Sequence, residues 1–328
     1  MHGEGLIRGR LAPSPTGALH LGNARSFLLA WLSLRSRGGT VVMRIEDLDH
    51  PKVKPWTIDE MFADLRWLGL DWDEGPDVGG AFGPYVQRER CELYAAALDV
   101  LKGKGLVYPC VCSRRDVELA QAAPHAEDYQ RYPGTCRGRF RSFAEASAAL
   151  PPERTPAWRF CASDETIGFD DGFAGRHEAN VAQRDGDFVL ARDLDGAGYM
   201  LSVVVDDAAM GISEVLRGDD LLPATHRQLL LYRALGLEPP LFVHVPLVVG
   251  PDGRRLAKRH GDTRLRAYRE QGIAPERIVG LLAWSCGLVP FGTACRPDEL
   301  VADFSLSKLP HEPLVLTEAL SGDLQAFA

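Results

Sequence analysis

The sequence predicts an α/β fold in which an insertion splits a Rossmann-type parallel sheet, with a small helical C-terminal region after the sheet. Three features predict this fold. A strand, turn, helix and strand open the chain, an α/β pattern returns after a stretch rich in Cys, Pro and Gly, and helical patterns follow that second half. The chain has 328 residues, 45% of them hydrophobic, which is enough for a large α/β core or for two to three domains.

The first half of the sheet is predicted from a βαβ unit. Residues 6–12 (LIRGRLA) have the pattern of a short strand, a turn rich in Pro and Gly follows, and a helical pattern covers about 23–37. The apolar, β-branched stretch 40–47 (TVVMRIED) predicts a buried strand. This order favours a parallel sheet with a right-handed crossover. Two more helices are expected at about 57–68 and 88–103.

An insertion interrupts this pattern before the second half of the sheet. Residues 108–141 carry Pro, Gly and clustered cysteines, and the Ala- and Pro-rich stretch 144–156 predicts a connecting helix and a linker. From about residue 187 the α/β pattern returns in FVLARDL, YMLSVVVDD and ISEVLRG, followed by a helix at 220–235 and the stretch LFVHVPLVVG. The two halves of the sheet are therefore expected to be far apart in sequence.

The C-terminal part is expected to be helical. Helical patterns cover 264–271 and 275–287, and a tail interrupted by Pro follows. The expected segments are the first half of a nucleotide-binding domain (1–107), the insertion (108–186), the second half (187–262) and the helical C-terminal region (263–328).

Composition and charge limit the class of function. The net charge of −8 argues against indiscriminate binding to nucleic acid, which depends on Lys and Arg at phosphates. It leaves open a nucleic acid docked on a local basic patch. The chain has no long apolar run, and no signal-peptide pattern follows Arg8 and Arg10. We therefore expect a cytoplasmic protein that does not bind membranes, and we expect a monomer.

Two basic motifs predict a nucleotide site. The tetrad from His20 to Asn23 follows a strand and a tight turn, where backbone amides and the helix dipole suit a phosphate. The loop GRRLAKRHGD at 253–262 follows the late strand. Taken alone, His20 is most simply an ordinary residue at the start of a helix. Taken alone, the loop 253–262 is most simply a solvated loop. Together they could face each other across the carboxyl edge of the sheet, where such folds bind nucleotides.

With these motifs the chain resembles the class I aminoacyl-tRNA synthetases. The His20 tetrad matches the first nucleotide motif of that family, and residues 255–259 match the second. The stretches RLAPSPTGALHLGN, RIEDLD, LGLDWDEGPDVGG and VVVDD…VLRGDDLL look like its glutamyl branch, over roughly 8–110 and 185–285. The resemblance implies a class I synthetase catalytic domain that activates an amino acid with ATP and Mg²⁺.

The resemblance also implies roles for individual residues. The expected catalytic residues are His20 and Lys258, which would stabilise charge on the phosphates of ATP. The expected ATP-binding residues are His20, Gly22, Asn23, Arg255 and Lys258, and the expected glutamate-binding residues are Arg10, Ala12, Ser14, Glu46, Tyr199 and Arg217. L-glutamate has two carboxylates and an ammonium, so its pocket needs two guanidinium groups and an acid. Without the family context, Arg217 and Glu46 could form a structural ion pair, and Tyr199 could be a core aromatic.

The cysteines suggest a metal site. Seven cysteines, three of them in one segment, suit reduced thiols with a metal better than a disulfide framework. The resemblance to the glutamyl-queuosine branch implies one structural Zn²⁺ at Cys110, Cys112, Tyr132 and Cys136. His125 lies in a lengthened gap before Tyr132 and is a possible substitute ligand. Free thiols in an apolar insertion are the alternative.

The resemblance to this branch also implies which molecule receives the activated glutamate. About 40 residues follow the helix at 275–287, which is short for an anticodon-binding domain, and Val203 stands where ordinary glutamyl enzymes carry a polar residue. Enzymes of the glutamyl-queuosine branch transfer activated glutamate to the queuosine base at the wobble position of tRNA(Asp). The expected partner is therefore the anticodon stem-loop of that tRNA. Possible phosphate contacts are Arg137, Arg139, Arg141 and the loop 254–260.

Three other functions remain open at this point. The first is a minimal glutamyl-tRNA synthetase that charges tRNA(Glu). The second is a non-enzymatic binder of RNA or protein, and the third is a nucleotidyltransferase related only through the His20 motif.

Overall fold

The structure is a computed structural model. It describes residues 7–48, 53–54, 56–113, 115–117, 131–192, 196–254, 256, 263–317 and 320.

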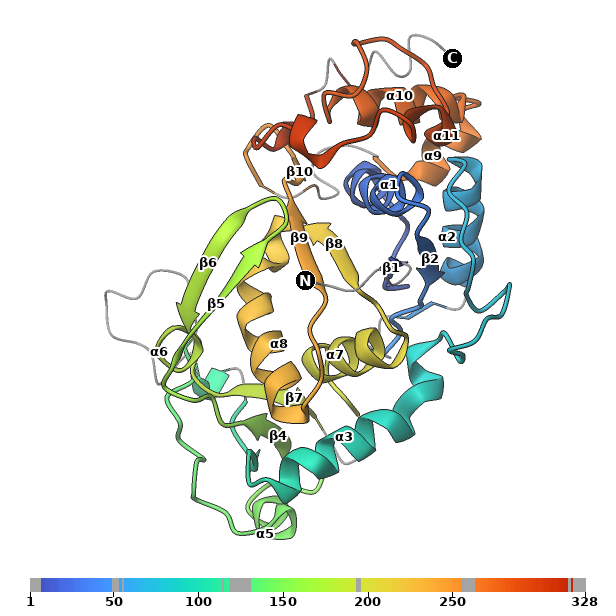
Figure 1. The fold of residues 1–328 in the computed structure, drawn as a ribbon. Helices are drawn as coiled ribbons and strands as arrows, with labels where there is room; N and C mark the ends of the chain where they lie inside the picture. The colour runs from blue at the N-terminus through green and yellow to red at the C-terminus, as the bar shows by residue number, and fades with distance from the viewer. Residues whose placement is uncertain are drawn as a thin grey trace.

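The central parallel sheet is assembled from two halves of the chain that are far apart in sequence. Its strands are β1 (Arg8–Leu11), β2 (Thr40–Met43), β8 (Glu214–Gly218) and β9 (Leu241–Val245). β1 pairs in parallel with β2, and β8 pairs in parallel with β9. The amide of Ser213 donates to the carbonyl of Arg8 (2.9 Å), which joins the two pairs along β1 and β8 (Figure 1). This arrangement confirms the predicted α/β fold with a split parallel sheet.

Helix α1 (Leu21–Arg35) lies between this sheet and the C-terminal helix α10 (Pro275–Trp284) (Figure 1). The close approach of α1 and β8 to β1 depends on Gly9. A Cβ at Gly9 would lie 2.8 Å from the side chain of Leu34 and 3.1 Å from the carbonyl oxygen of Glu214. A side chain at residue 9 would therefore crowd the end of the Leu34 side chain and the backbone of β8.

The insertion contains an antiparallel sheet with the strand order β3-β4-β7. Its strands are β3 (Val107–Cys110), β4 (Ala157–Phe160) and β7 (Phe188–Ala191). Phe188 of β7 pairs with Phe160 of β4. The boundary predicted at residue 187 therefore needs a correction, because β7 completes the sheet of the insertion. The chain returns to the central domain after β7, with helix α7 (Tyr199–Ala209).

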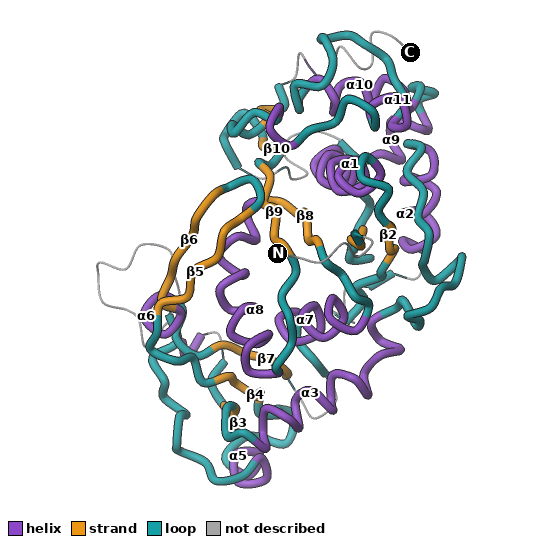
Figure 2. Tube along the Cα trace, viewed as in Figure 1, coloured by secondary structure: helices purple, strands orange, loops and turns teal. Residues whose placement is uncertain are grey.

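A long hairpin that the sequence analysis did not anticipate connects the insertion to the central sheet. Its strands are β5 (Thr166–Asp171) and β6 (Gly175–Asn180), paired in antiparallel fashion. At its tip the amide of Gly172 donates to the carbonyl of Phe242 in β9 (2.8 Å). Figure 2 shows the two strands running beside helix α8 to β9. The hairpin thus carries residues of the insertion to the edge of the central sheet.

A second apolar core forms where three helices meet: α7 packs against α3 (Cys91–Gly103) and α8 (Leu222–Leu235). Val203, Val204 and Val205 are all buried in α7. Three consecutive β-branched residues suit a strand by local preference. Burial between two helices outweighs that preference here.

The remaining helices are α2, which has 12 residues, and several helices of three to six residues. They are α2 (Trp56–Trp67), η2 (Gln87–Arg90), α5 (Phe143–Ala148), α6 (Val181–Arg184), η3 (Asp219–Leu221), α9 (Leu265–Glu270), α11 (Pro297–Leu300) and η5 (Leu306–Lys308).

The C-terminal region contains the two predicted helices, but much of it is loop, and part of its tail returns to the central domain. Strand β11 (Leu314–Val315) pairs in parallel with β10 (Val248–Val249). Leu309 and Leu316 are buried in the core that contains α1 and α10. These two leucines therefore anchor the tail beyond α11, whose other described residues are exposed or half-buried. Within the described residues, every helix is too short or too polar to cross a membrane.

Candidate active site

His20 is the N-cap of α1 and fixes the start of the helix. Its Nδ1 accepts from the amides of Gly22 (3.1 Å) and Asn23 (3.4 Å), and the side-chain oxygen of Asn23 accepts from the amide of His20 (3.2 Å). This is a reciprocal capping box. Because Nδ1 accepts, the proton of the neutral ring is on Nε2. The first motif is thus a helix start built by its own side chains.

The backbone amides at the start of α1 are engaged within the protein. The amides of Gly22 and Asn23 donate to His20, and the amide of Leu21 donates to the carbonyl of Thr263 (3.0 Å). The expectation that these amides face a phosphate therefore needs a correction. What this end of the helix offers to an anion is the imidazole of His20 and the helix dipole.

A cavity of about 500 Å³ opens at the carboxyl ends of β1, β2 and β8. Of the predicted residues, it is lined by Arg10, Ala12, Ser14, His20, Gly22, Asn23, Glu46, Tyr199 and Arg217. Every residue expected at glutamate thus lies at the same cavity as the first nucleotide motif. Thr16, Ser26 and Asp220 also line it, and the sequence analysis did not select them.

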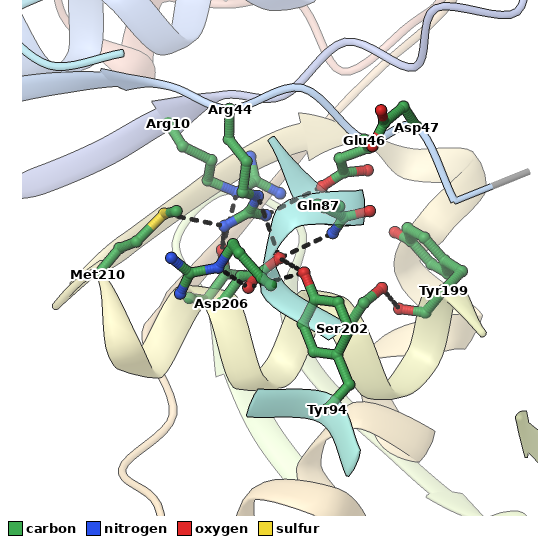
Figure 3. Close-up of polar contacts among 12 residues, drawn as sticks. Arg10, Arg44, Glu46, Asp47, Gln87, Tyr94, Tyr199, Ser202, Asp206 and Met210 are labelled. Atoms are coloured by element: carbon green, nitrogen blue, oxygen red, sulfur yellow. Dashed lines mark hydrogen bonds and ion pairs between the residues drawn. The ribbon is translucent and has the colours of Figure 1, made fainter. Parts of the chain in front are cut away.

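Glu46 is the acid predicted for this cavity, and its carboxylate is held by Arg44. Nη2 of the fully buried Arg44 donates to Glu46 Oε1 (2.9 Å), and Nη1 donates to Asp207 Oδ1 (2.7 Å). Figure 3 shows Arg10 and Arg44 side by side above α7. Burial raises the pKa of Glu46, and Arg44 and Arg10 oppose this rise. Burial lowers the pKa of Arg44, but Asp207 and Glu46 outweigh it and keep that pKa well above its usual value.

Arg10 and Tyr199 border the same space. Nη1 of Arg10 donates to the carbonyl of Leu216 (3.4 Å), and its Nε lies 3.5 Å from Asp207 Oδ1. Asp207 is therefore shared by Arg10 and Arg44. Tyr199 is 39% exposed, so it is part of the cavity wall and not a core aromatic.

Arg217 is a buried cation held by neutral groups. Its Nε donates to His244 Nε2 (3.0 Å), and its Nη2 donates to Thr225 Oγ1 (2.9 Å) and Gln228 Oε1 (2.7 Å). Nη1 is buried and has no hydrogen-bond partner among the described residues. Burial lowers the pKa of Arg217, and the nearby Arg10 lowers it further. A carboxylate in the cavity would satisfy Nη1 and balance the charge.

The sequence analysis missed the partners of Arg217, namely His244, Thr225 and Gln228. One signal was present, since His244 is a polar residue within the apolar strand sequence LFVHVPL. A buried polar residue needs a partner. The pattern alone could not show which partner it has.

The second basic motif is only partly described. Arg255, Lys258, Arg259 and His260 lie outside the described residues. The chain on either side of the loop is placed at the cavity: Val248 lines it, and the amide of Leu265 donates to the carbonyl of Leu19 (2.9 Å) just before His20. Described residues before and after the loop, Val248 and Leu265, thus lie near the first motif.

Three thiols and a phenol converge in the insertion. The sulfurs of Cys110, Cys112 and Cys136 lie within 4.8 Å of one another. The hydroxyl of Tyr132 lies 3.4 Å from Cys110 Sγ and 3.7 Å from Cys112 Sγ. The guanidinium of Arg159 lies over the ring of Tyr132 and donates to Cys110 Sγ (3.4 Å). Burial opposes ionisation of Cys110, but Tyr132 and Arg159 outweigh it and lower the pKa of this thiol.

These donors fit a tetrahedral metal ion, because thiolates are preferred zinc ligands and the hydroxyl oxygen of Tyr132 is close enough to be the fourth donor. The short distances among the three sulfurs therefore support the prediction of a metal-binding cluster. His125, the possible substitute ligand, lies outside the described residues.

The arginines expected at RNA have different surroundings. Arg137 donates to the carboxylate of the buried Asp187 (2.8 Å) and helps to hold β7. Arg139 lies over the ring of Phe140, and Arg141 is exposed. Arg137 therefore has a structural task within the insertion.

Residues 6–293 match the family described as tRNA synthetases class I (E and Q), catalytic domain. The chain belongs to this class I tRNA synthetase family, and it is a ligase.

Named relatives narrow the similarity further. The Glutamyl-Q tRNA(Asp) synthetase of Symbiobacterium thermophilum is 51% identical over 312 residues, which are 94% of this chain and 95% of that relative. Glutamate–tRNA ligase 2 of Syntrophus aciditrophicus is 40% identical over 313 residues, which are 95% of this chain and 64% of that relative. The crystal structure of a glutamate tRNA ligase from Elizabethkingia meningosepticum in complex with its amino acid has a TM-score of 0.80 at 29% identity, covering 97% of this chain and 68% of that one.

Proposed function

We propose that the protein activates L-glutamate with ATP and transfers it to the queuosine base at the wobble position of tRNA(Asp). The observation that carries the first step is Arg217. It is a buried guanidinium whose Nη1 has no hydrogen-bond partner among the described residues, at a cavity that Arg10, Glu46 and His20 also line. The named relatives support the choice of tRNA(Asp), since the Glutamyl-Q tRNA(Asp) synthetase is the more similar of the two kinds of relative.

In the first step the side-chain carboxylate of glutamate would pair with Arg217, and its ammonium would lie near Glu46. The α-carboxylate would then attack the α-phosphorus of ATP, forming the acyl-phosphate bond as the bond to pyrophosphate breaks. This reaction needs no protein nucleophile, so catalysis consists of alignment and of stabilising charge on phosphate oxygens. We assign that stabilisation to His20 and Lys258, with Gly22, Asn23 and Arg255 beside ATP. Mg²⁺ would accompany ATP and neutralise phosphate charge.

In the second step the activated carboxyl group would be attacked by a hydroxyl of the queuosine base, and AMP would leave. The anticodon stem-loop would have to reach the cavity mouth. Arg139, Arg141 and the 254–260 loop remain proposed phosphate contacts. For Arg137, the ion pair with Asp187 makes a structural role the simpler one.

We assign Zn²⁺ to the cluster of Cys110, Cys112, Tyr132 and Cys136. The ion would have a structural role, because four protein donors would close its coordination shell. It would hold β3 to the segment that carries Tyr132 and Cys136. Arg159, at 3.4 Å from Cys110 Sγ, would offset part of the negative charge of the ligands.

The experiment is transfer of labelled glutamate, with ATP and Mg²⁺, to three RNAs in parallel. They are tRNA(Asp) that contains queuosine, tRNA(Asp) that lacks it, and tRNA(Glu). Label only on the first supports the proposal. Label on tRNA(Glu) would instead mean the second candidate, a glutamate–tRNA ligase, which the 40% identity to such a relative keeps in consideration.

A further inference from the structure

Arg217 is the end of a chain of three buried side chains that come from three separate segments. Asp171 ends β5 of the insertion, His244 lies in β9, and Arg217 lies in β8. Asp171 Oδ2 lies 2.6 Å from His244 Nδ1, and Asp171 Oδ1 accepts from the amide of His244 (3.0 Å). The side chains of Asp171 and His244 are both 0% exposed. The hairpin of the insertion is thus joined to the proposed glutamate pocket through one histidine.

The protons of this chain can be placed from its donors. A guanidinium only donates, so His244 Nε2, which receives the Nε–H of Arg217 at 3.0 Å, must offer its lone pair. The ring proton is then on Nδ1 and is donated to Asp171. Burial lowers the pKa of His244, and Arg217 and His177 lower it further, whereas Asp171 opposes them. Thr225, from α8, contributes only a hydroxyl at 3.2 Å from Nε2, so the ring is held neutral.

This arrangement determines which atom of Arg217 meets a ligand. His244 holds Nε, and Thr225 and Gln228 hold Nη2. The guanidinium plane is therefore fixed, and Nη1 is the position without a hydrogen bond among the described residues. All three holding groups are neutral. None of them balances the positive charge of Arg217, which the nearby Asp207 only favours electrostatically.

We propose that Asp171 and His244 are positioning residues that fix Arg217 so that the cavity selects an amino acid with a side-chain carboxylate over its amide. This inference rests on the proposed function and assigns a task to residues outside the cavity lining. A carboxylate both accepts from Nη1 and neutralises the guanidinium, whereas an amide oxygen accepts from Nη1 but carries no charge to neutralise it. A site with a fixed, buried donor discriminates strongly against a ligand that leaves the charge of that donor without a counter-charge.

The test is the substitution Asp171→Asn. The Asn oxygen can keep the bonds that Asp171 Oδ1 accepts from the amides of Phe173 and Ala174. Its NH₂ group, however, would donate to His244 Nδ1 and move the ring proton to Nε2, opposite the donor of Arg217. Such a change of tautomer disables a histidine without removing it. Asp170→Asn is the matched control, since Asp170 is the neighbouring acid, 81% exposed and paired with Arg176 on the surface.

The readout is glutamate-dependent exchange of pyrophosphate into ATP, with glutamine as the competing amino acid. For Asp171→Asn we expect the KM for glutamate to rise about 10- to 100-fold, the value of a charge-assisted hydrogen bond. The preference for glutamate over glutamine should fall by a similar factor, and the KM for ATP should stay within about twofold of wild type. Asp170→Asn should behave as wild type.

A rescue variant separates positioning from folding. In His244→Gln the side-chain oxygen can take the place of Nε2 and accept from Arg217 without help from Asp171. Adding Asp171→Asn to His244→Gln should therefore change the KM for glutamate by less than about threefold. If Asp171→Asn does not fold, His244→Leu, which offers no acceptor, is compared with His244→Gln and should show the larger KM.

Two kinds of failure are distinguishable. Wild-type protein without glutamate-dependent exchange would refute the proposed function, and calorimetric titration of glutamate and glutamine into the same variants would then still test the positioning role. A folded Asp171→Asn protein that keeps wild-type KM and selectivity would overturn the inference, as would an equal loss when the substitution is made in His244→Gln.

Discussion

Replacing Arg217 by Lys tests whether the cavity recognises a side-chain carboxylate through a guanidinium. Arg217 makes three hydrogen bonds of 2.7 to 3.0 Å, and no described residue accepts a hydrogen bond from its Nη1. Lys retains a charge, but one ammonium cannot donate to His244, to Gln228 and to a ligand in the same geometry. The loss of one charge-assisted hydrogen bond is worth about 1.5–3 kcal/mol, so we expect the KM for glutamate to rise about 10- to 100-fold.

The assay is pyrophosphate exchange at varied glutamate and saturating ATP, with a thermal melt to show that the variant folds. The KM for ATP should change less than about twofold, because His20 and the start of α1 are untouched. Arg233→Lys is the control: Arg233 lies on α8, is 61% exposed and pairs with Glu165. A folded Arg217→Lys protein with a glutamate KM within about twofold of wild type would refute the reasoning.

Three further predictions concern the metal, the basic loop and a buried acid. Cys136→Ser should abolish bound zinc and lower the melting temperature, whereas Cys91→Ser should not; wild-type protein without zinc by elemental analysis would contradict the site. Lys258→Ala should lower the rate of activation about 10²–10³-fold with little change in the KM for glutamate, and an unaltered rate would remove Lys258 from the mechanism. Burial raises the pKa of Asp64 from 3.8 to about 6 despite Arg269, so the folded state binds the proton more tightly and stability falls as the pH rises between these values. Asp64→Asn should therefore stabilise the protein above about pH 6, by at most about 3 kcal/mol, and not below about pH 4; urea unfolding at both pH values checks this.

Local patterns predicted much of the fold. The βαβ start, the return of the α/β pattern and the C-terminal helices depend on the spacing of apolar residues within short stretches. Helices α1 and α10 lie close to their expected bounds, whereas β2 begins where expected and ends four residues earlier, at Met43. The β5–β6 hairpin was not anticipated. Its sequence TIGFDDGFAGRHEAN is largely polar and lacks a clear alternation, and its pairing places Asp171 at β9.

The residues of the candidate site were predicted through the resemblance, but their partners were not. Glu46 was predicted as the acid for an ammonium group. Its ion pair with Arg44 was not predicted; both residues follow β2, and Arg44 also pairs with Asp207 of α7. Arg217 was chosen as a guanidinium. The packing of β8, β9 and α8 decides that its hydrogen-bond partners are neutral and that, within the described part of the chain, none of them reaches Nη1.

The sequence by itself determined the features that depend on near neighbours in the chain. These are the helix start capped by His20, the strands of the parallel sheet, and the cysteine pair that precedes Tyr132. The tertiary structure decided which distant residues share a buried space. β7 pairs with the sheet of the insertion. Asp171 contacts His244, which in turn accepts a hydrogen bond from Arg217. The physical reason is that a buried polar atom is stabilised by a hydrogen bond to whichever group the packing places next to it. A sequence pattern does not show which residues from distant segments become neighbours.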